Sequence, residues 1–361
     1  MQTTSRDPAP HDVGPASMDR ALEVDQILEL DERMAALEDA ADAAMLAPSV
    51  HGSQPWTIVL HRDRLELRAD RTRQLAGLDP AGRELVQSLG AALMNVRVAL
   101  AARGWAADVD RLPRPGDPEL AALVRPVPGA PEGHLPLLAD ALRQRRTHRT
   151  GFWAEEVPQE LLDHLAAAAL AEHGDLVAVS SPEDRRLIAR LTLEADAVQH
   201  ADPACADDLR RWQQEPADGR RTVDSRTGED RTYVLLTSRA DGPIDWLRSG
   251  EAMERVLLEV TRLGWAASPM TQVLEVPSTR AELRASTTWE AYPQMLLRIG
   301  FADARTPSSR RHREDVVVNS TRLEVRSAPA DGGRLSRNTV SGSEPAIRRP
   351  VSDGRGGTTW I

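Results

Sequence analysis

A short loop near the start of the chain concentrates side chains that can form hydrogen bonds. The stretch LAPSVHGSQPWTIVL, residues 46–60, leads from an alanine-rich segment with helical spacing into an apolar, β-branched run. Between the two it places Ser49, His51, Gly52 and Gln54. Ser49 and Gln54 can donate and accept hydrogen bonds, which suits a rigid loop that binds the polar edge of a ligand. A structural role is the alternative, because Ser49 could cap the turn after the proline and His51 has no triad partner nearby in sequence.

A second group of polar residues could bind phosphate. The sequence contains no lysine, so the 45 residues counted as Lys or Arg are all arginines. A Walker-A loop, a pyridoxal Schiff base and a Ser–Lys dyad all need lysine, so these mechanisms are excluded. The stretch RRTHRTGF combines Arg145, Arg146 and Arg149 with Thr147. Arginine forks and a hydroxyl suit a phosphate monoester, although the same arginines could form a solvated cluster at the end of a helix.

Four segments in order along the chain resemble motifs of the nitroreductase superfamily. Residues 47–56 are similar to the motif Ala-Pro-Ser-x-x-Asn-x-Gln-Pro-Trp, and residues 145–149 are similar to Arg-Arg-Ser-x-Arg. LGWAASPMTQ, residues 263–272, resembles the family segment that passes the flavin N5 edge. QMLLRIGFADARTPSSRRHREDVV, residues 294–317, resembles the C-terminal motif whose basic residues approach the phosphate. The resemblance covers residues 25–317 and is greatest to the fused actinobacterial branch, the dormancy-associated Acg type.

This resemblance implies an α+β, nitroreductase-like fold that binds FMN between two related halves. In the family, the first loop contacts the isoalloxazine ring, and the arginine motif contacts the phosphate and the ribityl chain. Gly52 departs from the family's asparagine, so a side-chain amide contact is absent. Each motif occurs once, so one complete site per chain is expected. The candidate cofactor-binding residues are Pro48, Ser49, Val50, Gly52, Gln54, Arg145, Arg146, Thr147, Arg149, Ser268, Pro269, Met270, Thr271, Arg310 and Arg311.

The activity implied by the resemblance is that of an FMN-dependent NAD(P)H oxidoreductase. NADH or NADPH would pass a hydride to flavin N5, and the reduced flavin would reduce a nitro compound or a quinone. No protein side chain is expected to be catalytic. Two alternatives stay open. One is an FMN-sequestering protein in which the polar residues 203–231 form a lid. The other is a flavin-free relative, which the glycine at position 52 motivates.

The spacing of apolar residues predicts the elements that position these motifs. The segments 110–120 and 125–133 are rich in proline and glycine and are expected to be connections. Strands are expected over residues 57–60, 65–68, 176–180, 233–237 and 294–299. Helices are expected over residues 24–45, 79–103, 135–145, 158–172, 182–201 and 246–263, with a short amphipathic piece at 209–213.

An internal repeat suggests how the chain is organised. GAALMNVRVALAARGWAA begins at Gly90, and GEAMERVLLEVTRLGWAA begins at Gly250, an offset of 160 residues. The repeat predicts two fused copies of one α+β unit that mimic a homodimer. Two unrelated helices with glycine caps are the alternative. The expected organisation is a disordered segment at 1–22, a first half at 23–134, a second half at 135–317 and a disordered tail at 318–361.

Composition excludes several other classes. The net charge of −10 argues against a nucleic-acid-binding surface. Cys205 is the single cysteine, so the chain can form no internal disulfide and no cysteine-based metal site. The nine histidines show no HxxxH or HxH spacing, so no metal site is expected. No membrane segment and no export signal are expected, which predicts a cytoplasmic protein. The resemblance implies a small-molecule electron acceptor as the partner, and a monomer is expected because the chain would itself mimic a dimer.

Overall fold

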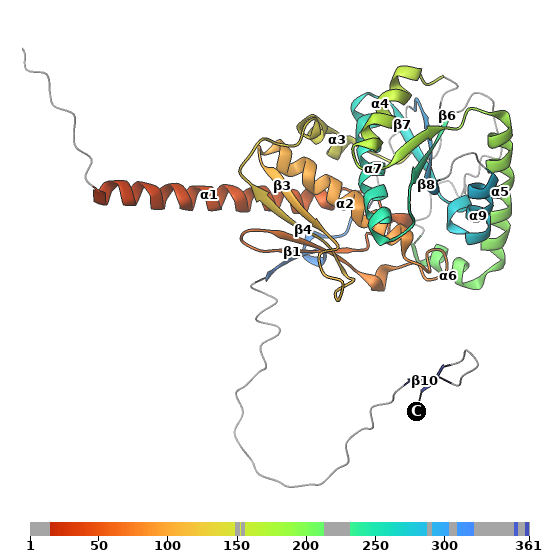
Figure 1. Cartoon of the computed structure of the whole chain (residues 1–361), viewed down its shortest axis with the longest axis horizontal. Helices are drawn as coiled ribbons and strands as arrows, with labels where there is room; N and C mark the ends of the chain where they lie inside the picture. Colours follow the sequence, from red (N-terminus) through yellow and green to blue (C-terminus); the bar gives the residue numbers. More distant parts are fainter. Residues whose placement is uncertain are drawn as a thin grey trace, which may run out of the picture. The chain divides into compact units, whose positions relative to one another are not determined.

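The computed structural model describes residues 15–148, 152, 156–212, 232–286, 291–302, 309–320, 350–352 and 358–360. The chain divides into two units, Met1–Leu323 and Glu324–Ile361. In the smaller unit, β10 (Pro350–Ser352) pairs antiparallel with β11 (Thr358–Trp360), within the segment that we expected to be a disordered tail. All other elements belong to the larger unit (Figure 1).

The first half of the larger unit contains two long helices and one antiparallel sheet. Helix α1 spans Pro15–Ala44, and therefore begins before the boundary that we expected at residue 22. The predicted hairpin is confirmed, because β1 (Trp56–Leu60) pairs with β2 (Leu65–Ala69). Helix α2 spans Arg83–Ala102, as the periodicity indicates, and strands β3 (Ala106–Arg111) and β4 (Leu120–Val127) follow it.

Strands β3 and β4 correct the expectation that 110–120 and 125–133 are only connections. The two strands pair along their full length, and Pro126 lies opposite Ala107. The pairing of β4 with β2 ends at Val124, so Pro126 lies where β4 pairs only with β3. A proline is tolerated there because its missing N–H is not needed by a second neighbour. The proline and glycine residues between β3 and β4 and after β4 are therefore the reason that the two strands were not predicted from the sequence.

A strand from the C-terminal end of the larger unit completes the first sheet. Strand β9 (Val317–Asn319) pairs parallel with β1, with Ile58 opposite Val317. The strand order is β3-β4-β2-β1-β9. The chain thus returns from the second half to the first, and it brings the segment 309–316 beside the loop that precedes β1.

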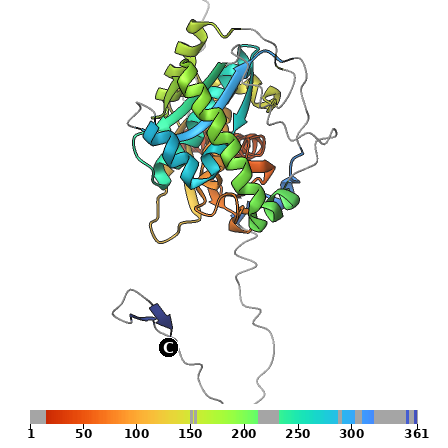
Figure 2. The same ribbon diagram turned by 90° about the vertical axis from the view of Figure 1, so that its right-hand side faces the viewer.

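The second half repeats this plan with two insertions. Its main elements are α4 (Gln159–Leu170), β5 (Asp175–Ala178), β6 (Thr232–Ser238), α7 (Pro243–Arg262), β7 (Ala266–Met270) and β8 (Tyr292–Gly300). One insertion holds α5 (Pro182–Ala201) and α6 (Pro203–Trp212), and the other holds α8 (Gln272–Glu275) and α9 (Pro277–Ser286). The short helices η3 (Leu135–Leu138) and α3 (Ala139–Gln144) connect the halves. Figure 2 shows α5 crossing one side of this half, where it packs against α8 and α9.

The sheets of the two halves have the same order. The second sheet runs β5-β6-β8-β7, and the first runs β1-β2-β4-β3 when it is read from β1 away from β9. Each half therefore follows one scheme, in which a helix and two strands precede a buried helix and two further strands. This shared order supports the duplication that the repeat predicts.

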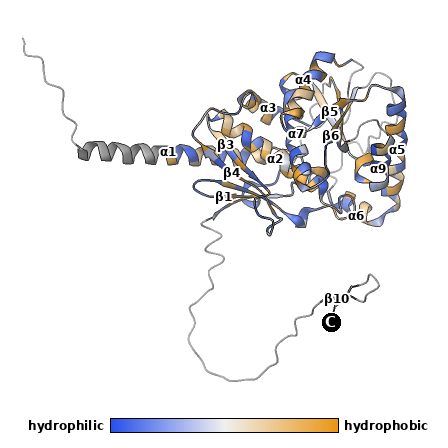
Figure 3. Cartoon of the chain, in the orientation of Figure 1, coloured by the Kyte–Doolittle hydropathy of each residue, from blue (hydrophilic) through white to orange (hydrophobic). Residues whose placement is uncertain are grey.

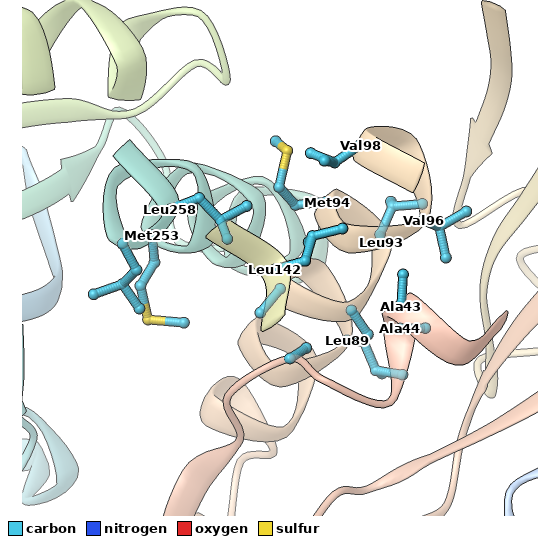
Figure 4. Close-up of a cluster of buried hydrophobic side chains, with 14 of the residues drawn as sticks. Ala43, Ala44, Leu89, Leu93, Met94, Val96, Val98, Leu142, Met253 and Leu258 are labelled. Carbon is cyan, nitrogen blue, oxygen red and sulfur yellow. The ribbon is translucent and has the colours of Figure 1, made fainter. Parts of the chain in front are cut away.

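Helices α2 and α7 lie side by side between the two sheets and form the centre of the core (Figure 1). Leu93 and Met94 from α2 and Met253 and Leu258 from α7 are buried there, together with Leu142 from α3 (Figure 4). The outer face of the second sheet has its own apolar cluster beneath α5, α8 and α9. A continuous core between the halves means that neither sheet is a separately packed domain.

The two glycines of the repeat meet at the crossing of α2 and α7. A Cβ atom on Gly90 would lie 2.0 Å from the carbonyl oxygen of Leu247, and one on Gly250 would lie 2.1 Å from that of Gln87. Both contacts are with main-chain atoms of the opposite helix. Glycine is therefore required at both positions because it alone lets the two backbones approach so closely.

Helix α2 is long and apolar enough to cross a membrane by its length and composition, contrary to our expectation for the sequence. However, 94% of its apolar window is buried inside the protein. Figure 3 colours α2 mostly from white to orange, whereas α5 carries both polar and apolar residues. A mostly apolar helix that is surrounded by protein is a core helix, and α2 occupies that position here, with its buried Arg97 paired to carboxylates.

Candidate functional site

The first predicted motif forms a tight loop between α1 and β1. The Ser49 hydroxyl accepts a hydrogen bond from the backbone N–H of Gln54 at 2.9 Å. The backbone N–H of Val50 donates to the hydroxyl of Ser88 on α2 at 3.0 Å. Val50, like Pro48, is half-buried. Ser49 thus has the turn-forming role that was the structural alternative for it, and the loop is fixed to the central helix.

Backbone strain is concentrated in the same loop. His51 and Gln54 have φ angles of 46° and 47°, and Gly52 between them has a φ of 70°. Residues other than glycine rarely occupy this left-handed region, and such strain gathers at functional sites when the surroundings enforce it. The loop is therefore held in one shape rather than left free to adapt.

The asparagine that the family motif has at position 52 can be tested directly. A Cβ atom on Gly52 would meet no atom within 4 Å, so there is space, but the φ of 70° opposes a side chain. Asparagine tolerates this region better than most residues. We expect Gly52→Asn to keep the fold and to tighten FMN binding by about 0.5–1.5 kcal/mol through a new hydrogen bond, as measured by quenching of flavin fluorescence. Gly52→Ala is the control, because it adds a Cβ atom at the same left-handed position without the amide, and tightening by both variants would contradict the contact.

The C-terminal segment binds the loop from the other side. The Gln54 side-chain oxygen accepts a hydrogen bond from the backbone N–H of Arg311 at 3.0 Å. The Arg311 guanidinium donates to the carbonyl oxygens of Gln54, Trp56 and Asp315 at 3.1, 3.0 and 2.7 Å. Two predicted cofactor residues, Gln54 and Arg311, therefore bind each other. The geometry gives Arg311 the task of positioning the loop.

Two other predicted arginines converge on one carbonyl oxygen. Arg145, after α3, and Arg310 each donate to the carbonyl oxygen of Leu46 at 3.0 Å. Burial and the neighbouring Arg145 lower the pKa of Arg310 to about 10. Arg146 donates to the carbonyl oxygens of Arg143 and Arg145. Positive charge is thus concentrated directly before the Pro48–Ser49 motif, which is the arrangement that an anion would stabilise.

Thr147, His148 and Arg149 are the remaining members of the arginine motif. Thr147 is half-buried, and Arg149 lies outside the described residues. The backbone N–H of His148 donates to the carbonyl oxygen of Ala267 at 3.1 Å, which brings this motif beside β7.

The segment from Ser268 to Thr271 lies on the second half, and the helix α8 that follows it contacts the first loop. Ser268, Pro269 and Met270 end β7 and are half-buried, and Thr271 is the residue before α8. At the end of α8, a carboxylate oxygen of the buried Glu275 lies 3.3 Å from Nε2 of His51. The fold therefore gathers all four sequence motifs into one region between the two halves.

Two buried carboxylates of this region were not foreseen from the sequence. Glu275 contacts His51, and Glu254 of α7 lies 3.2 Å from Nε of Arg145. The repeat carried a signal for the second of them, because Glu254 aligns at the same offset with Met94 in the first copy. A charge at a position that is apolar in the other copy indicates a local function.

A polar cavity of about 350 Å³ lies elsewhere, and none of the predicted cofactor residues lines it. Its walls include Asp108, Val109 and Arg111, which the repeat aligns with Ser268, Pro269 and Thr271. Residues 171–173, which follow α4 as the first loop follows α1, also line it. The cavity thus occupies the place that the sequence repeat relates to the candidate site.

Several residues that line this cavity form a network of ion pairs. Arg97 of α2 forms ion pairs with Glu132, Glu172 and Glu251 at 2.7, 2.5 and 2.8 Å. Arg111 pairs with Glu251 at 2.6 Å, and Arg255 pairs with Glu172 at 2.5 Å. Burial opposes the charge on Arg97, but the nearby carboxylates raise its pKa above the ordinary value for arginine. The network joins the two halves.

Comparison with known proteins identifies the family of this chain. The family model described as "Nitroreductase family" matches residues 142–301. The Mycobacterium tuberculosis protein named "Putative NAD(P)H nitroreductase Rv3131" is 33% identical, over 76% of this chain and 88% of that protein. A second protein of that organism, "Putative NAD(P)H nitroreductase acg", is 30% identical, over 74% of this chain and 89% of that protein. Among solved structures, the FMN- and NADPH-dependent nitroreductase NfnB from sphigopyxis sp. strain HMH is 20% identical, with a TM-score of 0.39 over 50% of this chain and 96% of that chain. The chain belongs to the nitroreductase family and has its α+β fold.

Proposed function

We propose that this protein is an FMN-dependent oxidoreductase that uses NADH or NADPH to reduce a small acceptor such as a nitro compound or a quinone. The observation that carries the proposal is the convergence of Arg145 and Arg310 on the carbonyl oxygen of Leu46. This convergence places two guanidinium groups beside a strained, hydrogen-bonding loop. Membership of the nitroreductase family supports the same activity.

The residues present fit the phosphate of FMN. Two neighbouring cations that share a single acceptor repel each other. Burial, and next this repulsion by Arg145, lower the pKa of Arg310. A phosphate monoester carries up to two negative charges and can accept several charge-assisted hydrogen bonds. Arg145 and Arg310 would hold the phosphate, with the hydroxyl of Thr147 nearby in the chain.

The other residues would position the ring system. The backbone of the first loop would meet the polar edge of the ring, and Gln54 and Arg311 would keep that loop in place. Bound FMN supplies the redox chemistry by accepting and donating a hydride. The protein's contribution is then orientation, exclusion of water and charge, because no side chain of the site is assigned a proton-transfer role.

The arginine assignment predicts a loss of affinity. Arg145→Ala and Arg310→Ala should each weaken FMN binding by about 1.5–3 kcal/mol, the range for hydrogen bonds to charged groups. Titration with flavin, followed by fluorescence quenching, measures the effect. Arg143→Ala is the matched control, because this substitution removes the same charge from an exposed position at the end of α3. Affinity within error of the wild type in both variants would remove the phosphate assignment.

A second candidate function is FMN storage without efficient turnover. It is supported by α6, which begins the segment 203–231 that we expected to form a lid. Asp208 of α6 accepts hydrogen bonds from the backbone N–H groups of Gly77 and Leu78 at 2.7 and 3.1 Å. Trp212, at the end of α6, packs in the same apolar cluster as Val50 of the first loop. Residues 213–231 lie outside the described part of the chain.

Anaerobic reduction separates the two functions. An oxidoreductase should bleach its flavin absorption on addition of NADPH or NADH and recover it with an acceptor. A storage protein should keep its colour, and a protein that purifies without flavin and binds none would reject both proposals.

We further propose that the chain acts as a monomer in the cytoplasm, where both nicotinamide donors are present.

A further inference from the structure

A buried carboxylate lies directly behind the phosphate arginines. Glu254 is in the middle of α7 and is completely buried. Its Oε1 atom lies 3.2 Å from Nε of Arg145, which is itself only 3% exposed. Within the described part of the chain, neither carboxylate oxygen of Glu254 has a hydrogen-bond partner of good geometry, and the same holds for Nε of Arg145. The pair is therefore a buried charge contact without a well-aligned hydrogen bond between the carboxylate and the guanidinium Nε.

The charges around Glu254 come from several elements. The connection after α3 provides Arg145, with Arg146 next to it, and the C-terminal segment provides Arg310. Helix α2 provides the uncharged amide of Asn95, which also acts to lower the pKa of Glu254. Helix α4 also packs against α7, but its His164 pairs with Glu259 rather than with Glu254. Glu254 is thus the carboxylate that acts on both converging arginines.

We propose that Glu254 is the internal counter-ion of the phosphate site, and that it takes up a proton from solvent when the phosphate of FMN binds to Arg145 and Arg310. This inference rests on the proposed function. Before binding, the carboxylate balances part of the arginine charge. After binding, the phosphate balances that charge, and an ionised Glu254 would be a third buried negative charge beside it. The proton adds to a Glu254 carboxylate oxygen, and no other bond changes.

The energetics allow this exchange near neutral pH. Burial raises the pKa of Glu254 to about 7, although Arg145 and Arg310 act in the opposite direction. Protonation at neutral pH therefore costs little. A bound phosphate adds negative charge nearby and raises this pKa further, because like charges disfavour ionisation. FMN should then bind with a proton, so its affinity falls as the pH rises above about 7, by at most about tenfold per pH unit.

Riboflavin provides a matched ligand, since it has the same ring and ribityl chain without the phosphate. Titration calorimetry in two buffers of different ionisation enthalpy at about pH 8, above the second pKa of the phosphate, measures the protons exchanged. The wild-type protein should take up protons with FMN, approaching one per site, and none with riboflavin. Its dissociation constant for FMN should also rise with pH, while that for riboflavin should stay constant.

Two variants complete the test. Glu254→Gln should bind FMN without proton uptake and with an affinity that is flat above neutral pH. Glu259→Gln is the control, because it removes another buried glutamate of α7 and should keep the wild-type uptake. If the wild-type protein binds FMN with no more proton uptake than riboflavin, the counter-ion role is overturned while the proposed function stands. If FMN does not bind at all, the proposed function itself fails. The wild-type comparison decides the question even if Glu254→Gln does not fold.

Discussion

Replacing Gly250 with alanine should lower the free energy of unfolding by about 3 kcal/mol, the upper end of the usual cost of overpacking. The added Cβ would lie 2.1 Å from the carbonyl oxygen of Gln87 on the opposite helix. No side-chain rotation relieves a clash with main-chain atoms, so α2 and α7 would have to separate. The gain in helix propensity from glycine to alanine, about 1 kcal/mol, is too small to compensate.

Chemical denaturation of Gly250→Ala and of Gly90→Ala measures this effect. The two variants should be similarly destabilised, because each glycine faces the main chain of the other helix. Gly116→Ala is the control, since a Cβ atom there meets nothing within 4 Å. Wild-type stability in either crossing variant would show that the helices can move apart without cost, and the close approach would then not be needed for the fold.

Replacing Arg97 with methionine should lower the stability by about 3–5 kcal/mol, the cost of removing one partner from a buried ion pair. The change leaves the buried Glu172 and Glu251 with one arginine partner each, Arg255 and Arg111. Arg97→Lys should recover only part of the loss, because an ammonium group cannot contact three carboxylates in the geometry of a guanidinium fork.

Arg125→Met is the matched control for Arg97→Met. Arg125 also contacts more than one carboxylate, those of Asp108 and Asp110, but its side chain is 37% exposed. Exposed pairs contribute about 0–1 kcal/mol. Thermal and chemical melts of the two variants should therefore differ clearly. An equal, small loss in both would show that the interior of the network is well hydrated.

The fold was predictable wherever contacts are local in sequence. The hairpin of β1 and β2, the helix α5 and the two central helices follow from spacing and turn residues that act over a few positions. Strand β9 could not be found in this way, because a three-residue strand gains its stability from a partner more than two hundred residues away. Strands β3 and β4 were missed because their flanking prolines and glycines resemble those of a plain loop.

The site was predictable as a set of motifs but not as a set of contacts. The order of the motifs along the chain identified the region that the fold assembles. The motifs did not reveal that Arg311 hydrogen-bonds to the first loop whereas Arg310 and Arg145 donate to the same carbonyl oxygen. The sequence alone does not distinguish the contacts of two adjacent arginines. Hydrophobic periodicity did not reveal the partners of buried carboxylates, because it does not say which charge a polar residue on a buried face will meet. For Glu254 the repeat gave only a partial signal, the alignment with the apolar Met94.

The cavity with its ion-pair network has a consequence for how this protein can change over evolutionary time. In a symmetric dimer, every substitution appears twice, so a residue that closes one site also closes the other. In this chain, Arg97, Glu172 and Glu251 each occur once, at the position that the repeat relates to the candidate site. If the chain is a duplication, as the repeat predicts, one half can be given over to stability while its counterpart keeps the ligand-binding role that we propose. Joining two copies in one chain separates two selection pressures that a homodimer must satisfy with the same residues.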